Sequence, residues 1–250
     1  MYYMKNNIKL FYEIYGKENK KEVLILPGWG DNRKTFTDMI NKLKDKYKIY
    51  IFDYPGFGNS SFPNKDLDIY DYSNLIYGFI KENSIKRPSI IAHSFGGRIS
   101  IILTGLYKLK LDKLILIDIA GIRRKSIKRW VKTHIYKLRK KLVIFKKNKL
   151  KYLNNLRKKY SSTDYNNLNK NMYITFKNII NEDLRKYIKE IKEDTLIIWG
   201  KQDIDTPIRD GYYIHKKIKN SKLIIYNNST HFVYIEEKDV IRRVKDFLTK

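Results

Sequence analysis

The 250-residue chain contains no cysteine, which excludes disulfide bonds, thiol catalysis and cysteine-based metal sites. It also lacks long apolar runs: none approaches the roughly 18 residues that a membrane-spanning helix requires, so we expect a soluble protein. The first 20 residues mix Lys and Glu with apolar side chains and have no apolar core of signal-peptide length. Together these absences predict a cytoplasmic location.

Acidic residues are scarce, with 26 Asp and Glu against 53 Lys and Arg, a formal net charge of +27. The imbalance is concentrated in residues 121–160, which contain 17 Lys and Arg and no Asp or Glu. The electrostatic field of so many positive charges attracts polyanions. Lys, Asn, Ile and Tyr are all abundant and all have AT-rich codons, which accounts for part of the lysine content. Because the sequence contains no recognisable nucleic-acid-binding module, nucleic acid is not an expected partner.

Strand-like and helix-like segments alternate along the chain, as is typical of a mostly parallel sheet with helices on both faces. The expected strands are 8–15, 23–26, 47–52, 89–93, 113–117, 195–199 and 222–226. The expected helices are 36–43, 69–83, 95–108, 213–217 and 237–249. The alternation stops over a strongly basic stretch without a strand signal. We therefore predict a core formed by residues 1–120 and 191–250, with residues 121–190 inserted as a basic helical lid.

Residues 92–97 read AHSFGG and lie between an expected strand and an expected helix. A serine on so tight a strand-to-helix turn needs very small residues two positions away on either side, and Ala92 and Gly96 meet this requirement. The turn exposes the Ser94 hydroxyl and directs the backbone N–H of Phe95, at the helix start, toward the same point. The pattern predicts a nucleophile elbow with Ser94 as the nucleophile.

A serine nucleophile needs a base and a carboxylate that orients the base. Asp203 follows the expected strand 195–199, and His231 follows the next expected strand along the chain. Active sites of parallel sheets collect at the carboxyl ends of the strands, so we expect both side chains to lie near Ser94.

Other carboxylates and histidines compete for these two roles. Asp205 lies in the same loop as Asp203, and Asp118 follows the strand 113–117, but the Gly-x-x-Asp spacing favours Asp203. His93 directly precedes the serine, and strand alternation should turn its side chain away, so we expect a structural role for it. The remaining histidines, for which we expect solvated or packing roles, are His134 in the lid and His215 on a surface helix.

Five motifs, taken in this order, resemble those of lid-bearing esterases and peptidases of the α/β-hydrolase family. They are the loops 26–30 (LPGWG) and 53–60 (DYPGFGNS), the elbow, and the loops that carry Asp203 and His231. The resemblance implies an α/β-hydrolase fold, no metal or organic cofactor, and an oxyanion hole made by the backbone N–H groups of Trp29 and Phe95. Two departures are visible: the family's usual His-Gly pair reads Pro27-Gly28, and Ala92 replaces the first elbow glycine. Neither removes a catalytic group.

The expected lid contains an amphipathic basic helix. Its apolar residues recur at intervals of three and four: Ile127, Trp130, Val131, His134, Leu138, Leu142 and Phe145. Most of the remaining surface is basic: Lys125, Lys128, Arg129, Lys132, Arg139 and Lys140. Either the apolar face lines the acyl pocket and the basic face is simply solvated, or the basic face binds an acidic carrier protein or an anionic membrane. The pimeloyl-acyl-carrier-protein methyl esterases, which this chain resembles, also have a Gly-Trp-Gly loop and a basic lid.

The leading functional prediction is a serine hydrolase that acts on a small carboxylic ester or a related acyl compound. Ser94 would attack the carbonyl, His231 would transfer the proton, and Asp203 would orient His231. The alternative prediction is a non-catalytic or moonlighting protein that binds anionic partners, such as nucleic acid or a membrane surface, through the basic lid.

Overall fold

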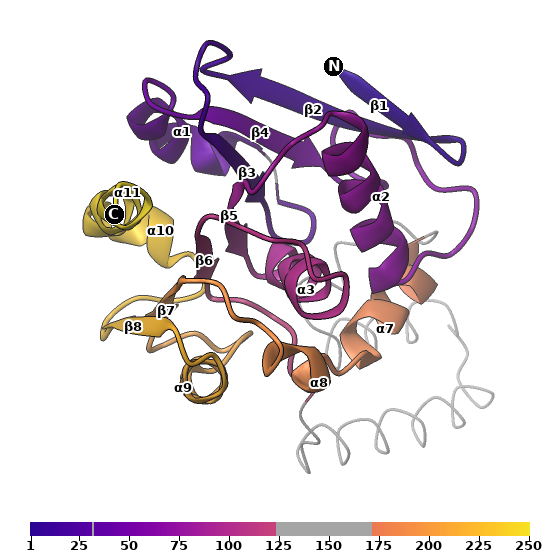
Figure 1. The fold of residues 1–250 in the computed structure, drawn as a ribbon. Coiled ribbons are helices and arrows are strands. Elements are labelled where there is room, and N and C mark those ends of the chain that lie inside the picture. Colours follow the sequence, from indigo (N-terminus) through magenta and orange to yellow (C-terminus); the bar gives the residue numbers. More distant parts are fainter. Residues whose placement is uncertain (32, 124–171) are drawn as a thin grey trace, which may run out of the picture.

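The computed structural model describes residues 1–31, 33–123 and 172–250, which form an eight-stranded sheet with its helices (Figure 1). The strands are β1 (Tyr2–Lys5), β2 (Ile8–Tyr15), β3 (Glu22–Leu26), β4 (Lys48–Asp53), β5 (Ser89–His93), β6 (Leu114–Ile117), β7 (Thr195–Gly200) and β8 (Ser221–Tyr226). Their order across the sheet is β1-β2-β4-β3-β5-β6-β7-β8. β2 is antiparallel to both β1 and β4, and all the other pairs are parallel. The predicted, mostly parallel sheet is confirmed.

Helices cover both faces of the sheet, as the alternation of segments predicts. The described α-helices are α1 (Thr37–Leu43), α2 (Ile69–Glu82), α3 (Phe95–Ile101), α7 (Tyr173–Asn181), α8 (Arg185–Ile188), α9 (Ile208–Lys217), α10 (Val233–Glu236) and α11 (Lys238–Leu248). A 3-10 turn, η1 (Arg33–Phe36), precedes α1, and a π-helical segment, η2 (Ile102–Leu106), continues α3. Helices α1 and α11 pack on one face, and α2, α3 and α9 pack on the other (Figure 1).

Central strands divide their side chains between the two faces because side-chain direction alternates along a strand. In β3, Leu24 and Leu26 belong to the core under α2 and α3, whereas Val23 and Ile25 belong to the core under α1 and α11. All four side chains are fully buried. Burial on both faces explains why the parallel strands appear in the sequence as continuous apolar runs.

Several boundaries differ from the sequence-based expectation. The expectation omits β1, in which Tyr3 is the one buried side chain, and it omits the single turn α10. Helix α9 begins at Ile208 instead of residue 213, and its N-cap Pro207 has the extended backbone typical of that position. The helix expected over 95–108 ends at Leu106, and its last part is π-helical.

Most of the predicted lid, residues 124–171, lies outside the described residues, as do the expected amphipathic helix and His134. The described remainder contains α7 and α8. Helix α7 is fixed to the start of α2: the Leu67 backbone N–H donates to the Thr175 hydroxyl at 2.9 Å, and the Tyr70 hydroxyl donates to the Glu182 carboxylate at 2.7 Å.

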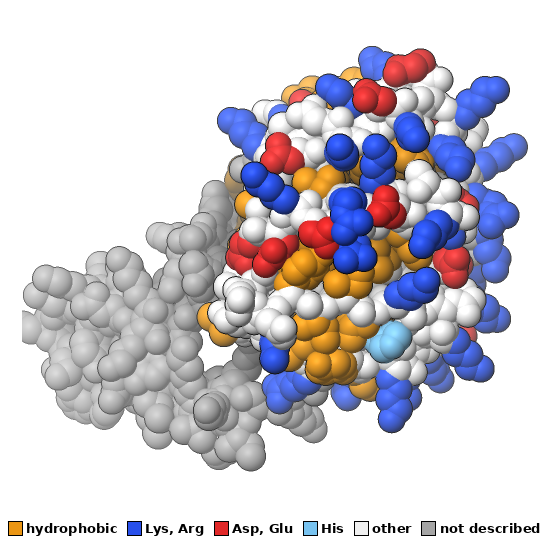
Figure 2. All heavy atoms as spheres, turned by 90° about the vertical axis from the view of Figure 1, so that its left-hand side faces the viewer, with side chains coloured by type: hydrophobic (Ala, Val, Ile, Leu, Met, Phe, Trp, Pro, Cys, Tyr) orange, Lys and Arg blue, Asp and Glu red, His pale blue; other side chains and the backbone are white. Residues whose placement is uncertain are grey.

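Within the described ranges, none of the helices combines the length and the apolar character that crossing a membrane would require. On the face seen in Figure 2, Lys and Arg side chains are spread over the surface with Asp and Glu between them. Oppositely charged side chains also pair on α11, where Arg242 and Arg243 form ion pairs with Asp239. This mixture fits the concentration of the basic excess in residues 121–160.

Candidate active site

Ser94 lies on a sharp turn between β5 and α3 and has φ 46° and ψ −110°, a positive φ that is rare outside glycine. The chain passes so close to the end of β3 that a Cβ on Gly96 would lie 1.9 Å from the backbone oxygen of Leu26. The Gly96 N–H instead donates to the Pro27 carbonyl at 2.9 Å. The turn therefore has the geometry expected of a nucleophile elbow, and it requires glycine at position 96.

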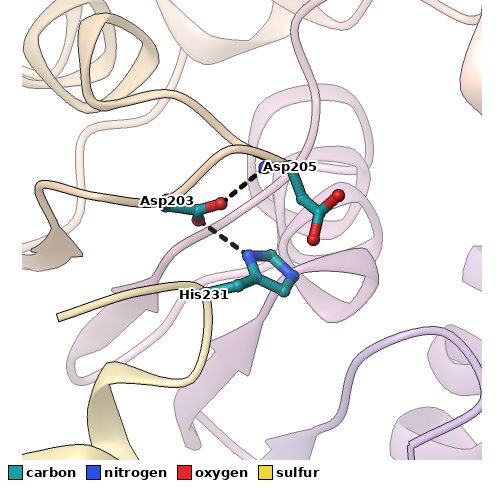
Figure 3. Close-up of side chains that lie close together, drawn as sticks. All are labelled: Asp203, Asp205 and His231. Carbon is teal, nitrogen blue, oxygen red and sulfur yellow. Dashed lines mark hydrogen bonds and ion pairs between the residues drawn. The ribbon is translucent and has the colours of Figure 1, made fainter. Parts of the chain in front are cut away.

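Three side chains from separate loops form one hydrogen-bonded chain. The Ser94 Oγ lies 2.9 Å from His231 Nε2, and His231 Nδ1 lies 2.7 Å from Asp203 Oδ2. Asp203 follows β7 and His231 follows β8, and Figure 3 shows the two side chains pointing toward one another. The structure thus brings together the serine, histidine and carboxylate that the sequence selects.

The Asp203 carboxylate is buried and is surrounded by hydrogen-bond donors. Its Oδ1 accepts from the backbone N–H groups of Asp205 at 2.8 Å and Thr206 at 2.9 Å, and its Oδ2 accepts from the Thr206 hydroxyl. Burial alone would raise the pKa of Asp203, but the hydrogen bonds from His231 and Thr206 outweigh burial and hold that pKa below its ordinary value. The group is therefore an anion at neutral pH.

The Asp203 carboxylate changes the pKa of His231. Burial would lower the pKa of His231, but the hydrogen bond and the negative charge of Asp203 raise it more, so the pKa lies above its ordinary value. Because His231 Nδ1 donates its hydrogen bond to Asp203 Oδ2, the neutral ring carries its proton on Nδ1 and leaves Nε2 free to accept a proton from Ser94.

The two rival carboxylates have other positions. Asp205 is exposed, and its side chain points away from Asp203 (Figure 3). Asp118 is fully buried and accepts the backbone N–H groups of Gly200 at 2.8 Å and Val233 at 3.4 Å. Burial raises the pKa of Asp118 to about 8, although the Gly200 hydrogen bond opposes the change. Asp118 therefore connects the end of β7, where the loop carrying Asp203 begins, with the first residue of α10, which follows the loop carrying His231.

Ligand atoms of Asp203, Asp205 and His231 lie within 4.8 Å of one another, a spacing compatible with a metal ion. Both ring nitrogens of His231 are already engaged, Nδ1 with Asp203 and Nε2 with Ser94. The hydrogen-bonded chain therefore accounts for this cluster without a metal.

His93 lies behind the site. Its ring is buried, and its Nε2 donates to the backbone oxygen of His231 at 2.8 Å. Burial lowers the pKa of His93 to about 3, so the ring is neutral and acts as a support for the histidine loop. His215 is on the exposed side of α9, where its Nδ1 lies 2.8 Å from the Ser221 hydroxyl.

Two backbone N–H groups border the serine. Phe95 is the first residue of α3, so its N–H has no acceptor within the helix. Trp29 follows β3 in a loop that touches the elbow, since a Cβ on Gly28 would lie 3.5 Å from the Ser94 Cβ. The Trp29 ring packs edge-on against Phe95 with 5.1 Å between the ring centres.

A cavity of about 180 Å³ opens beside Ser94 and His231. One wall is apolar and comes largely from α7, through Phe176, Ile179 and Ile180. The described charged residues in its lining are Arg98, Arg123, Asp205 and Asp210. The reactive groups therefore face a space of small-molecule size with both apolar and charged walls.

Sequence reasoning missed Arg98 and the α7 side chains as parts of this cavity. Arg98 carries a readable signal, because it is the one charged residue in the apolar helix that follows Ser94, and it comes four residues after the serine. Nothing in the sequence of α7 marks it as a cavity wall, since its position depends on contacts with residues far away in the chain.

Comparisons with known proteins agree with the motifs. A family model described as alpha/beta hydrolase fold matches residues 21–238. An uncharacterized hydrolase of Bacillus subtilis is 26% identical over 97% of this chain and 95% of its own length. A pimeloyl-acyl-carrier-protein methyl ester esterase of Wigglesworthia glossinidia brevipalpis is 26% identical over 96% of this chain and 97% of its own length.

Two solved structures have a similar fold. The enol-lactonase from Burkholderia xenovorans has a TM-score of 0.75 and 21% identity, with all of both chains covered. An esterase from Exiguobacterium antarcticum also has a TM-score of 0.75 and 21% identity, with 97% of this chain and 96% of its own covered. The fold that the sequence motifs predict is thereby confirmed.

Proposed function

This chain belongs to the alpha/beta hydrolase fold family, and from that premise we propose that it is a serine hydrolase that cleaves a carboxylic ester or a related acyl compound. The observation that carries the proposal is the hydrogen-bonded chain from Ser94 through His231 to Asp203 beside a cavity. The names of its relatives, which include hydrolases and esterases, support the same class of reaction.

In the first half of the reaction, the Ser94 oxygen attacks the carbonyl carbon while its proton passes to His231 Nε2. The tetrahedral intermediate then collapses. The bond between the carbonyl carbon and the leaving oxygen breaks, and that oxygen takes the proton from His231 and departs as an alcohol. The acyl group remains esterified to Ser94.

In the second half, a water molecule gives a proton to His231 and attacks the acyl carbon. Collapse of the second intermediate returns the proton to the Ser94 oxygen and releases the carboxylic acid. One ester and one water are consumed, and one acid and one alcohol are formed. Asp203 stays ionised throughout, keeps the His231 ring in the required tautomer and stabilises the imidazolium when it forms.

The negative charge on the carbonyl oxygen needs hydrogen-bond donors that are already in place. We assign this role to the backbone N–H groups of Phe95 and Trp29. The first belongs to the N-terminus of α3, where the helix dipole also favours an anion. Because both donors are backbone groups, the role does not depend on the side chains at these positions.

An acyl group bound to an acidic carrier protein, or held at an anionic membrane, is the macromolecular substrate that the basic segment 121–160 would favour. The name of the Wigglesworthia esterase refers to an acyl-carrier protein, so a carrier-bound acyl group is the first of these two substrates to test. We do not favour a purely non-catalytic role, because binding an anion requires no hydrogen-bonded serine, histidine and carboxylate.

The proposal is tested by screening p-nitrophenyl esters of increasing acyl length with the wild-type protein, Ser94→Ala, His231→Ala and the double variant. Each single substitution should lower kcat by several orders of magnitude, and the double variant should be little worse, because the residues act as a unit. Nearly wild-type activity of Ser94→Ala on the best ester would overturn the proposal. Ester-independent binding of nucleic acid or vesicles, with no turnover, would favour the non-catalytic alternative.

A further inference from the structure

Arg98 is a buried cation in the wall of the cavity that holds Ser94. It lies on α3, four residues after the serine, a spacing that places the two residues on the same side of the helix start. Its exposed fraction is 6%, and it lines the cavity together with Ser94 and His231. The rest of α3 is uncharged, so this guanidinium is the only positive charge that the helix carries.

The described residues satisfy few of the hydrogen-bond donors of this guanidinium. Its Nη1 donates to the backbone oxygen of Glu182 at 3.0 Å, just beyond the end of α7. Among the described residues, no carboxylate forms an ion pair with it. The nearby carboxylates have other partners: that of Glu182 accepts from the Tyr70 hydroxyl at 2.7 Å, and that of Asp183 accepts from Arg185 Nε at 2.9 Å.

The surroundings disfavour the charge. Burial lowers the pKa of Arg98 to about 10, although the charges of Glu182 and Asp183 act in the opposite direction. At neutral pH the group is still protonated. A buried cation with several free N–H groups is unfavourable unless an anion completes its hydrogen bonds, and the planar guanidinium binds a carboxylate with two parallel hydrogen bonds.

The other charged residues of the cavity do not meet this need. Arg123 and Asp205 are exposed, so water solvates both charges. Asp210 is buried on α9, and in the described part of the chain its carboxylate forms no ion pair with Arg98. Arg98 is therefore the buried cation, among the described lining residues, that can bind an anion in the cavity.

We propose that Arg98 binds a carboxylate on the acyl part of the substrate, so that the preferred substrates are half-esters of short dicarboxylic acids. The proposal rests on the serine hydrolase function proposed above and adds the class of acyl group. Since Ser94 and Arg98 are one helical turn apart, the carboxylate lies only a few carbon atoms from the scissile carbonyl.

Three methyl esters of equal acyl length test this preference: methyl hexanoate is neutral, monomethyl adipate is an anion and methyl 6-aminohexanoate is a cation at neutral pH. The readout is the ratio of kcat/KM for each charged ester to kcat/KM for methyl hexanoate. Because both values are measured on the same preparation, the ratio does not depend on the fraction of the enzyme that is folded. For the wild-type protein we expect the adipate ratio to exceed about 10, a difference of about 1.4 kcal/mol.

Arg98→Gln keeps an N–H donor for the Glu182 carbonyl but removes the charge, and Arg98→Lys keeps the charge but loses the planar fork. The adipate ratio should fall about tenfold in Arg98→Gln, mainly through KM, and less in Arg98→Lys. Arg242→Gln is the matched control, because Arg242 is exposed on α11 and pairs with Asp239. Its ratio should equal that of the wild-type protein.

The outcomes separate the two proposals. If methyl hexanoate is hydrolysed through Ser94 but the adipate ratio is near 1, or if Arg98→Gln leaves the ratio unchanged, Arg98 serves only to hold the end of α7 and the inference is wrong. A preference for methyl 6-aminohexanoate would indicate that Asp205 and Asp210, and not Arg98, bind the charged end of the acyl group. If no ester is hydrolysed by the wild-type protein, the hydrolase function itself fails, and the inference fails with it.

Discussion

Asp203→Asn is the substitution for which the structure gives the sharpest expectation. Asp203 Oδ1 accepts two backbone N–H groups, from Asp205 and Thr206, and an asparagine must keep its carbonyl oxygen there to preserve both hydrogen bonds. Its amide nitrogen then faces His231 Nδ1, which lies 2.7 Å from the carboxylate oxygen of the native side chain.

An amide in that position donates to Nδ1 and drives the ring proton to Nε2. His231 then has no free nitrogen to accept the proton of Ser94, and the negative charge that stabilises the imidazolium is also lost. We expect kcat to fall by about ten-thousandfold, the size known for replacing the carboxylate of such a triad by an amide. The fold should persist, because the substitution keeps the size of the side chain and the two hydrogen bonds from backbone N–H groups of the loop.

The assay is kcat and KM on the best p-nitrophenyl ester, with the Tm measured beside it. Asp205→Asn is the control, because Asp205 contacts Asp203 only through its backbone N–H, and we expect its kcat to stay within about threefold of wild type, as for an exposed side chain. The reasoning would be refuted if Asp203→Asn kept more than a tenth of wild-type kcat, or if Asp205→Asn were the more damaging of the two.

Three further outcomes are expected. Because Asp203 raises the pKa of His231, kcat/KM should fall as the pH drops through a value above the ordinary histidine pKa of about 6.5, and a flat profile down to about pH 4 would exclude His231 as the base. Gly96→Ala should lower the free energy of unfolding by about 3 kcal/mol in urea titrations, because the new Cβ meets a backbone oxygen at 1.9 Å; a change below about 0.5 kcal/mol would contradict the close approach. Reversing Lys128, Arg129 and Lys132 to Glu should raise KM for a carrier-linked ester and weaken its salt dependence but change KM for a small neutral ester far less; equal changes on both would assign these charges to solvated surface.

The sheet and the elbow can be predicted from the sequence because their signals are local. The apolar runs identify the strands, and the small residues around Ser94 identify a turn that few other sequences allow. The assignment of Asp203 over Asp205 also rests on local spacing, and the structure places Asp203, not Asp205, against His231.

Other features depend on contacts between distant parts of the chain. β1 forms because Tyr3 pairs with Leu10 across a hairpin, and four residues alone carry too little pattern to predict a strand. The role of Asp118 depends on the amides of Gly200, at the end of β7, and of Val233, at the start of α10, both of which lie far from it in the sequence. The cavity wall formed by Phe176 on α7 likewise follows from long-range packing and not from its local sequence.

The measurement that tests the central claim most directly is covalent labelling with a fluorophosphonate probe, followed by mass spectrometry of the labelled peptide. We expect one probe per chain, attached to Ser94, with labelling greatly slowed in His231→Ala and absent in Ser94→Ala. Absence of labelling in the folded wild-type protein, or attachment to a different serine, would contradict the assignment of Ser94 as the activated nucleophile.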